Sequence, residues 1–152
     1  MQIEILAIGR ARAGPERDLY QTYAKRIRWP LTLRELEEKR RLPPAELKAR
    51  EGAMLLEALP QDAAVVALDE TGKTLSSEEF AGRIGRWQDE GRAATAFVIG
   101  GADGLSDELR DRADLLIAFG RQTWPHMLVR AMLAEQIYRA QQILAGHPYH
   151  RG

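Results

Sequence analysis

The sequence predicts an α/β protein with a mostly parallel sheet flanked by helices. Two apolar runs, residues 63–68 and 94–99, lack the alternation of a half-exposed strand, so each fits a central strand covered on both faces. Each run is followed by a polar turn and then by a capped helix, which is the order of a parallel-sheet unit. A chain of 152 residues with 45% hydrophobic content suits one compact domain, residues 1–152.

The first half of the chain is expected to alternate strands with helices. Residues 2–8 are an apolar run that ends at a glycine, as a strand followed by a loop would. A helix begins at Pro15, and residues 31–36 then alternate as a half-exposed strand does. A second helix covers residues 44–59 and is closed by a proline. The apolar face of the first helix is expected to consist of Leu19, Tyr23 and Ile27.

Capping residues mark the helix starts in the second half. Ser76 precedes a helix that runs to Gly91, and Ser106 precedes a short helix. Residues 115–119 form a third apolar run. The last predicted helix, residues 127–145, contains neither glycine nor proline.

The last helix has an apolar arc that is wider than one core face needs. Thr123 and Pro125 mark its start, because threonine can cap a helix and proline is favoured in the first turn. So wide an arc is buried on two sides, either inside its own domain or against another subunit, and the sequence leaves both interpretations open. The arc consists of Leu128, Val129, Met132, Leu133, Ala134, Ile137, Tyr138, Ala140 and Leu144.

Three loops follow the carboxyl ends of the predicted strands, at residues 68–73, 100–105 and 119–125. Ligands bind outside the carboxyl ends of strands in open α/β sheets, so these loops predict a pocket. Neither glycine motif is specific: residues 72–74 lack phosphate-loop spacing, and the turn at residues 100–104 only loosely resembles a dinucleotide turn.

Composition excludes several classes of site. The chain has no cysteine, so disulfides, thiolate metal sites and cysteine nucleophiles are unavailable. The three histidines lack a carboxylate at ligand spacing, and we expect no metal. No apolar run approaches membrane-spanning length and the start of the chain is too charged for a signal peptide, so we expect a cytoplasmic protein without a membrane partner.

Cationic side chains are concentrated near the C-terminus, although the chain as a whole has zero net charge. Residues 121–152 contain four arginines against a single acid, Glu135, and this local excess indicates an anionic partner. After the helix stop at Gly146, residues 147–151 offer two imidazoles, a phenol and a guanidinium. Such a tail is unlike an ordinary disordered end, so we expect it to belong to the site.

Five segments together resemble the RlmH-type family of SPOUT-class methyltransferases. In chain order they are LDETGK, IGGADGLS, TWPHMLVR, EQIYRA and the terminal HPYHR, and they cover nearly the whole chain. The resemblance implies an α/β fold with a C-terminal trefoil knot and a homodimer that uses S-adenosylmethionine. Members of this family methylate N3 of a pseudouridine in a stem-loop of 23S ribosomal RNA on the assembled ribosome.

The resemblance also assigns residues. The methyl donor would be held chiefly by backbone groups of Leu68, Gly100, Gly101, Phe119, Gly120, Arg121, Gln122, Thr123, Trp124 and Pro125. The tail, residues 147–151, would complete the active site. From the chemistry of the reaction we select a second set that would meet the target base: Arg139, Tyr149, His150 and Arg151.

Each residue of the second set has an expected role. Methyl transfer to a ring nitrogen needs an aligned donor and loss of the N3 proton. Arg139 and Arg151 are candidates for anion and phosphate contacts, His150 for the proton acceptor, and Tyr149 for stacking on the base. Glu135 is expected to be an ion-pair partner of Arg130 or Arg139 rather than a catalytic group.

Two other functions fit parts of the sequence. The glycine-rich turn at residues 100–104 would also suit a nucleotide-binding α/β protein, and the cationic tail would suit a ribosome- or RNA-binding module without chemistry. Binding of S-adenosylmethionine together with methyl transfer would separate both from the methyltransferase.

Overall fold

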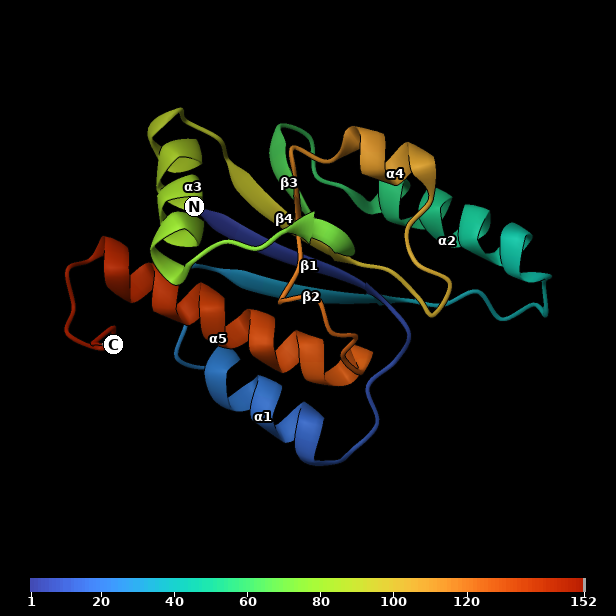
Figure 1. Cartoon of the computed structure of the whole chain (residues 1–152), viewed down its shortest axis with the longest axis horizontal. Coiled ribbons are helices and arrows are strands. Elements are labelled where there is room, and N and C mark those ends of the chain that lie inside the picture. Colours follow the sequence, from blue (N-terminus) through green and yellow to red (C-terminus); the bar gives the residue numbers. More distant parts are fainter. Residues whose placement is uncertain (152) are drawn as a thin grey trace.

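The computed structural model describes residues 1–151, which form one five-stranded sheet with five helices around it (Figure 1). In chain order the elements are β1 (Gln2–Ile8), α1 (Pro15–Ala24), β2 (Leu31–Leu36), α2 (Pro44–Ala58), β3 (Ala63–Lys73), α3 (Ser77–Asp89), β4 (Ala94–Ile99), α4 (Asp107–Arg112), β5 (Leu115–Ile117) and α5 (His126–Leu144).

The sheet has the strand order β2-β1-β4-β3-β5, and every pairing in it is parallel. All six residues of β4 are buried, as are the first five of β3, which confirms both as central strands. Because all strands run the same way, their carboxyl ends lie along one edge of the sheet. The predicted α/β class with a parallel sheet is therefore confirmed.

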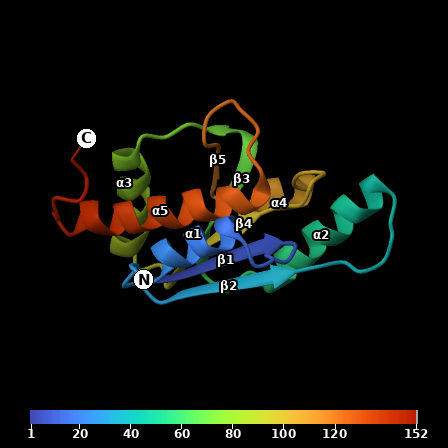
Figure 2. The same cartoon turned by 90° about the horizontal axis from the view of Figure 1, so that it is seen from below.

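Helices cover both faces of this sheet (Figure 2). Successive strand residues point to opposite faces, so Ile5 packs in the core with α1, α3 and α5, whereas Leu6 packs with α2 and α4. α5 lies against both α1 and α3. Among the described residues no helix is both long and apolar enough to span a bilayer.

Of the face expected for the first helix, Ile27 is buried in the core and Tyr23 packs against it, but Leu19 was wrong. Leu19 is 42% exposed, and Tyr20 is buried in its place. α1 packs on the rest of the core through Tyr20, Tyr23 and Ala24, a set that has helical spacing just as the predicted one has. Burial raises the pKa of the Tyr20 phenol to about 12.

The structure also corrects two boundaries. β3 continues to Lys73, where the sequence DETGK predicts a loop, because the end of the strand crosses β5 and Lys73 pairs with Ile117. Gly72 permits this crossing, since a β-carbon there would lie 2.6 Å from the backbone of Ile117. α5 begins one residue earlier than predicted, with Pro125 at the N-cap position and no side-chain cap from Thr123. The predicted serine caps of α3 and α4 are confirmed.

Packing within the chain accounts for much of the wide apolar arc of α5. Leu133, Ala134 and Ile137 are buried in the core. Leu128 and Met132, one turn apart, are half-buried and belong to neither main core cluster. These two residues form an apolar stripe on α5 that lies outside both main core clusters.

One buried cation anchors α5 to the sheet. The Arg130 side chain is 2% exposed; its guanidinium donates to the Glu35 carboxylate at 2.5 Å and to the backbone oxygens of Ile8 and Gly9 at 3.3 and 2.8 Å. Burial opposes ionisation of Glu35, but hydrogen bonds from the Ala11 N–H and from Arg130 outweigh it and hold the pKa of Glu35 below its usual value. The last helix is thereby fixed to the ends of β1 and β2.

Arg130→Met should lower the free energy of unfolding by about 3 kcal/mol, because it leaves a carboxylate and two carbonyls without their donor. The pKa of Glu35 is lowered by folding, so this stabilisation is present above the unfolded pKa and is lost as pH falls below about 4. Urea denaturation at fixed protein concentration, at pH 7 and in acid, measures both effects. Arg86→Met on the exposed surface of α3 is the control, and an equal loss in that variant would contradict the anchoring role.

Candidate functional site

A cavity of about 360 Å³ opens at the carboxyl edge of the sheet, where the sequence places its three loops. β3 and the turns after β4 and β5 form its walls, and the first residues of α5 close it. Of the residues predicted to hold the donor, eight line this cavity: Leu68, Gly100, Gly101, Phe119, Gly120, Gln122, Thr123 and Trp124. Arg121 does not line it, and Pro125 faces a neighbouring cavity between α1 and α5.

Two glycines let the turn after β4 pack closely against Leu105 and Glu51. A β-carbon at Gly100 would be 2.8 Å from the Leu105 side chain and 3.1 Å from the Gly104 oxygen. A β-carbon at Gly101 would be 2.6 Å from a carboxylate oxygen of Glu51. Any side chain at either position would therefore displace the turn that forms the cavity wall.

The loop after β5 presents its own backbone. Gly120 has φ +91°, a left-handed conformation that favours glycine, and the Trp124 indole donates to the Phe119 oxygen at 2.8 Å. Among the described residues, no acceptor takes a hydrogen bond from the N–H groups of residues 120–124. These donors are free for a ligand, which fits a site that holds its ligand through the backbone.

Charged side chains also line the cavity, and sequence reasoning did not select them. Asp69 accepts from Arg110 at 2.8 Å and from the N–H and hydroxyl of Thr71. Lys48, Glu70 and Asp103 also line the cavity. The position of Asp69 directly after a buried strand was the available signal. The cavity thus has carboxylates for a cationic group and cations for an anionic one.

Glu51 lies behind the glycine turn and was also missed. Its side chain is buried and one carboxylate oxygen has no hydrogen-bond partner. Burial, together with the nearby Asp103 carboxylate, raises the pKa of Glu51. Nothing in the helical pattern of α2 distinguishes this glutamate from its exposed neighbours.

The tail is ordered against α5 and α3. The Tyr149 ring meets that of Tyr138 edge-on with centroids 4.7 Å apart, its hydroxyl donates to Glu135 at 3.2 Å, and the Arg139 guanidinium lies 4.8 Å from its centroid. Arg139 pairs with Glu135 at 2.7 Å, which confirms the structural role expected for Glu135. Burial and the Glu135 carboxylate raise the pKa of Tyr149, so the phenol stays protonated at neutral pH.

Both ring nitrogens of His150 are engaged. Its Nδ1 lies 2.9 Å from the Arg139 guanidinium, and its Nε2 lies 2.6 Å from the Glu78 carboxylate. A guanidinium can only donate, so this pattern assigns the neutral tautomer with its proton on Nε2. To accept a proton at Nδ1, His150 must first give up the bond from Arg139.

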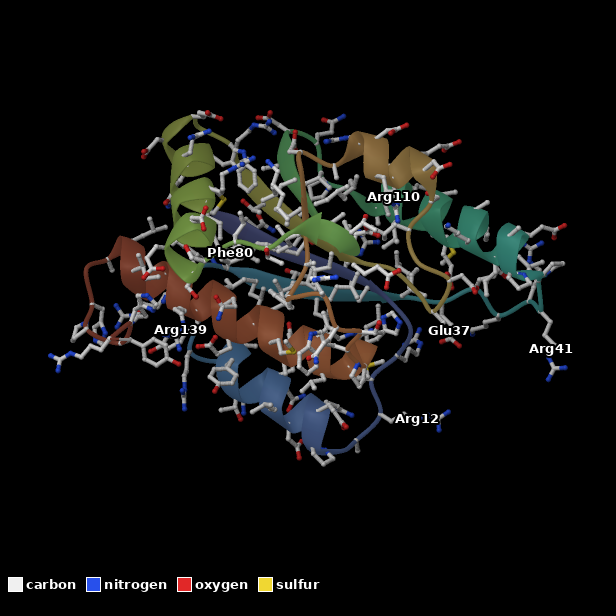
Figure 3. The ribbon with its side chains drawn as sticks, viewed as in Figure 1. Arg12, Glu37, Arg41, Phe80, Arg110 and Arg139 are labelled. Carbon is white, nitrogen blue, oxygen red and sulfur yellow. The ribbon has the colours of Figure 1, made fainter. Side chains whose placement is uncertain are left out.

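The tail does not reach the cavity of its own chain. No described residue beyond Val129 lines the cavity. The tail contacts α5 at Glu135 and Arg139, nine and thirteen residues after His126, which is roughly 14–20 Å along a helix. Figure 3 shows Arg110, at the cavity, and Arg139, at the tail, on opposite sides of the molecule. Within one chain the tail and the cavity are therefore separate regions.

No group of three or more histidine, aspartate or glutamate side chains within residues 1–151 is arranged to hold a metal ion. The cavity and the tail offer backbone donors, arginines, carboxylates, an imidazole and a phenol.

Comparison with known proteins gives a consistent result. The family model described as "Predicted SPOUT methyltransferase" matches residues 1–150. A protein of Rhodospirillum centenum is 62% identical over 151 residues, and one of Paramagnetospirillum magneticum is 57% identical over 151 residues; each match covers 99% of both chains. Both relatives are named ribosomal RNA large subunit methyltransferase H.

A solved structure, the SpoU methyltransferase AviRb from Streptomyces viridochromogenes with AdoMet, matches with a TM-score of 0.48 and 13% identity. The match covers 93% of this chain and 58% of AviRb. The full-length family match and the two close relatives carry the assignment: the chain belongs to the SPOUT methyltransferase family, in its RlmH group.

Proposed function

We propose that this chain transfers a methyl group from S-adenosylmethionine to N3 of a pseudouridine in 23S ribosomal RNA. The observation that carries the proposal is the cavity at the strand ends, with its unpaired backbone donors, in a chain of this family. The names of the relatives indicate large-subunit ribosomal RNA as the substrate, and the resemblance to the RlmH-type family implies the pseudouridine. An enzyme with this substrate acts in the cytoplasm, and its substrate is the assembled ribosome. We further propose that the chain acts as a single domain.

The residues of the cavity fit this donor. S-adenosylmethionine supplies an electrophilic methyl group on a sulfonium. The donors of residues 120–124 suit the polar edges of an adenosine, and the carboxylates of Glu70 and Asp103 complement a positive charge. Glycines at positions 100 and 101 leave room for backbone to approach the ligand closely.

The tail supplies a cationic group for the target base. Loss of the N3 proton leaves negative charge on the base, and a guanidinium beside it lowers the cost of that charge. Among the described residues the Arg151 guanidinium has no acceptor, whereas Arg139 is committed to Glu135. Arg151 is therefore the better candidate for contact with the anion, and Arg139 orients Tyr149 and His150.

A homodimer would bring the tail and the cavity together. If α5 pairs antiparallel with a second copy about a two-fold axis at Met132, positions 135 and 139 of one helix face positions 129 and 125 of the other. The tail of one chain then lies beside the cavity rim of its partner. The half-buried stripe of Leu128 and Met132 supports this arrangement, as does the separation of the tail from its own cavity.

The close crossing of β3 over β5 at Gly72 supports the C-terminal trefoil knot that the sequence resemblance implies.

A non-catalytic RNA-binding module remains the second candidate function, since the cationic tail alone would be enough for RNA binding. Such a module would not need a cavity with free backbone donors.

The dimer is tested by sedimentation at micromolar concentration. The parent should sediment as twice 17.1 kDa, and Met132→Glu should shift it toward the monomer, because two carboxylates would meet at the axis. Asp89→Lys, an equally drastic change at the exposed end of α3, is the control. A parent that is only a 17.1 kDa monomer would overturn the dimer.

Gly100→Val should abolish binding of S-adenosylmethionine in calorimetry, since its side chain would collide with Leu105 and Gly104 and push the turn into the cavity. Gly82→Ala is the control, because a β-carbon there meets nothing within 4 Å. If Gly100→Val folds and binds the donor as the parent does, the pocket lies elsewhere.

Truncation after Gly146 should leave donor affinity nearly unchanged and cost about 1 kcal/mol of stability, from the lost Tyr149 packing. Methylation of ribosomes should fall by orders of magnitude, and Arg151→Ala should reproduce much of that loss. Unchanged activity after truncation would remove the tail from the mechanism.

Mixing the truncated chain with Gly100→Val tests whether the site is shared. A heterodimer would contain one complete site, formed by the intact cavity of the truncated chain and the tail of the Gly100→Val chain. Partial activity is expected from heterodimers purified by two affinity tags. Inactive heterodimers would show that each tail serves its own chain.

A further inference from the structure

Two loops at the same edge of the sheet as the cavity carry a second concentration of arginines. Residues 9–14 follow β1 and residues 37–43 follow β2, and between them lies an open groove of about 950 Å³. We use the name arginine surface for the four arginines that line this groove, Arg10, Arg12, Arg40 and Arg41.

The arginines of this surface are only partly neutralised. Arg10 pairs with Glu37 at 3.3 Å, and Arg40 pairs with Glu38 at 2.9 Å. Arg12 and Arg41 make no ion pair with any described residue, and Figure 3 shows both projecting outward beyond Glu37. Exposed arginines held away from acids repel one another, so an anionic partner would stabilise them.

The loop after β2 is held in place by its acids. Hydrogen bonds from Arg40 and Arg50 lower the pKa of Glu38 to about 2, so this carboxylate stays ionised and ties the loop to α2. Arg41 directly follows Arg40 in the sequence, so its backbone is held beside this cluster before any partner arrives. Preorganisation of this kind reduces the ordering cost of binding.

The groove and the donor cavity are neighbours. Glu51 lines the groove, and a β-carbon on Gly101, which lines the cavity, would lie 2.6 Å from its carboxylate. A partner whose reacting base enters the cavity would therefore carry its adjoining backbone over this groove.

The chemistry of the groove points to phosphates rather than to bases. Among the described residues its lining contains no aromatic side chain on which a base could stack, and its aliphatic members are Ile8, Leu42 and Leu47. Guanidinium groups bind phosphate oxygens in bidentate fashion and without regard to sequence.

We propose that the arginine surface binds the phosphate backbone of the ribosomal RNA stem-loop, and so positions the target nucleotide over the donor cavity. This assignment rests on the proposed function. It separates recognition from chemistry: the arginine surface supplies affinity, and the cavity and tail supply methyl transfer.

The test compares Arg12→Gln/Arg41→Gln with Arg28→Gln/Arg86→Gln, an exposed pair that removes the same charge at the other edge of the sheet. Binding of labelled protein to ribosomes that lack the methyl group is measured from low to high salt, beside calorimetry with S-adenosylmethionine. The first double variant should bind ribosomes at least about tenfold more weakly, with a salt slope smaller by about 2, while donor affinity stays unchanged. The control pair should match the parent.

Methylation kinetics give the second measurement. In the first double variant KM for ribosomes should rise at least about tenfold with kcat within about twofold, since these arginines bind the substrate and do not touch the reacting atoms. Parent-like binding and KM, an equal loss in the control pair, or a fall in kcat alone would each overturn the arginine surface. A parent that binds ribosomes through these arginines without methylating them would overturn the proposed function and leave the surface standing.

Discussion

The buried Arg130 guanidinium is the interaction on which the arrangement of the molecule depends. It reaches from α5 to the Glu35 carboxylate and to the carbonyls of Ile8, the last residue of β1, and Gly9, where the parallel strands leave backbone groups without partners. Near the other end of α5, the Gln141 side chain accepts from the N–H groups of Arg28 and Trp29. With a polar anchor at each end, α5 cannot slide, and its first turn stays at the rim of the cavity.

Much of the fold could be predicted because its signals are local. The central strands are continuous apolar runs, and Ser76 and Ser106 cap helices as their positions indicate. The errors arose where distant contacts override local pattern. DETGK has the composition of a turn, yet it extends β3 because it crosses β5, and Tyr20 rather than Leu19 faces the core because α1 packs on α5.

The candidate site was predictable to a different degree in its two halves. The cavity follows from strand ends and glycines, so eight of the ten expected residues line it. The tail could be recognised by composition, but its contacts could not, because His150 meets Glu78 across 72 positions of sequence. Glu51 gave no periodic signal, since a buried carboxylate on a helix looks like a solvated one until its neighbours are known. Asp69 was marked only by its position after a buried apolar run.

The position of α5 in the sequence has a consequence for biosynthesis. α5 is the last helix to be made, yet it covers α1, the first, and supplies the centre of the larger core. Until its synthesis is complete, the apolar faces of α1 and α3 have no cover and Glu35 has no buried cation. The nascent chain must therefore emerge with an open hydrophobic layer, a surface that favours aggregation until α5 packs on it.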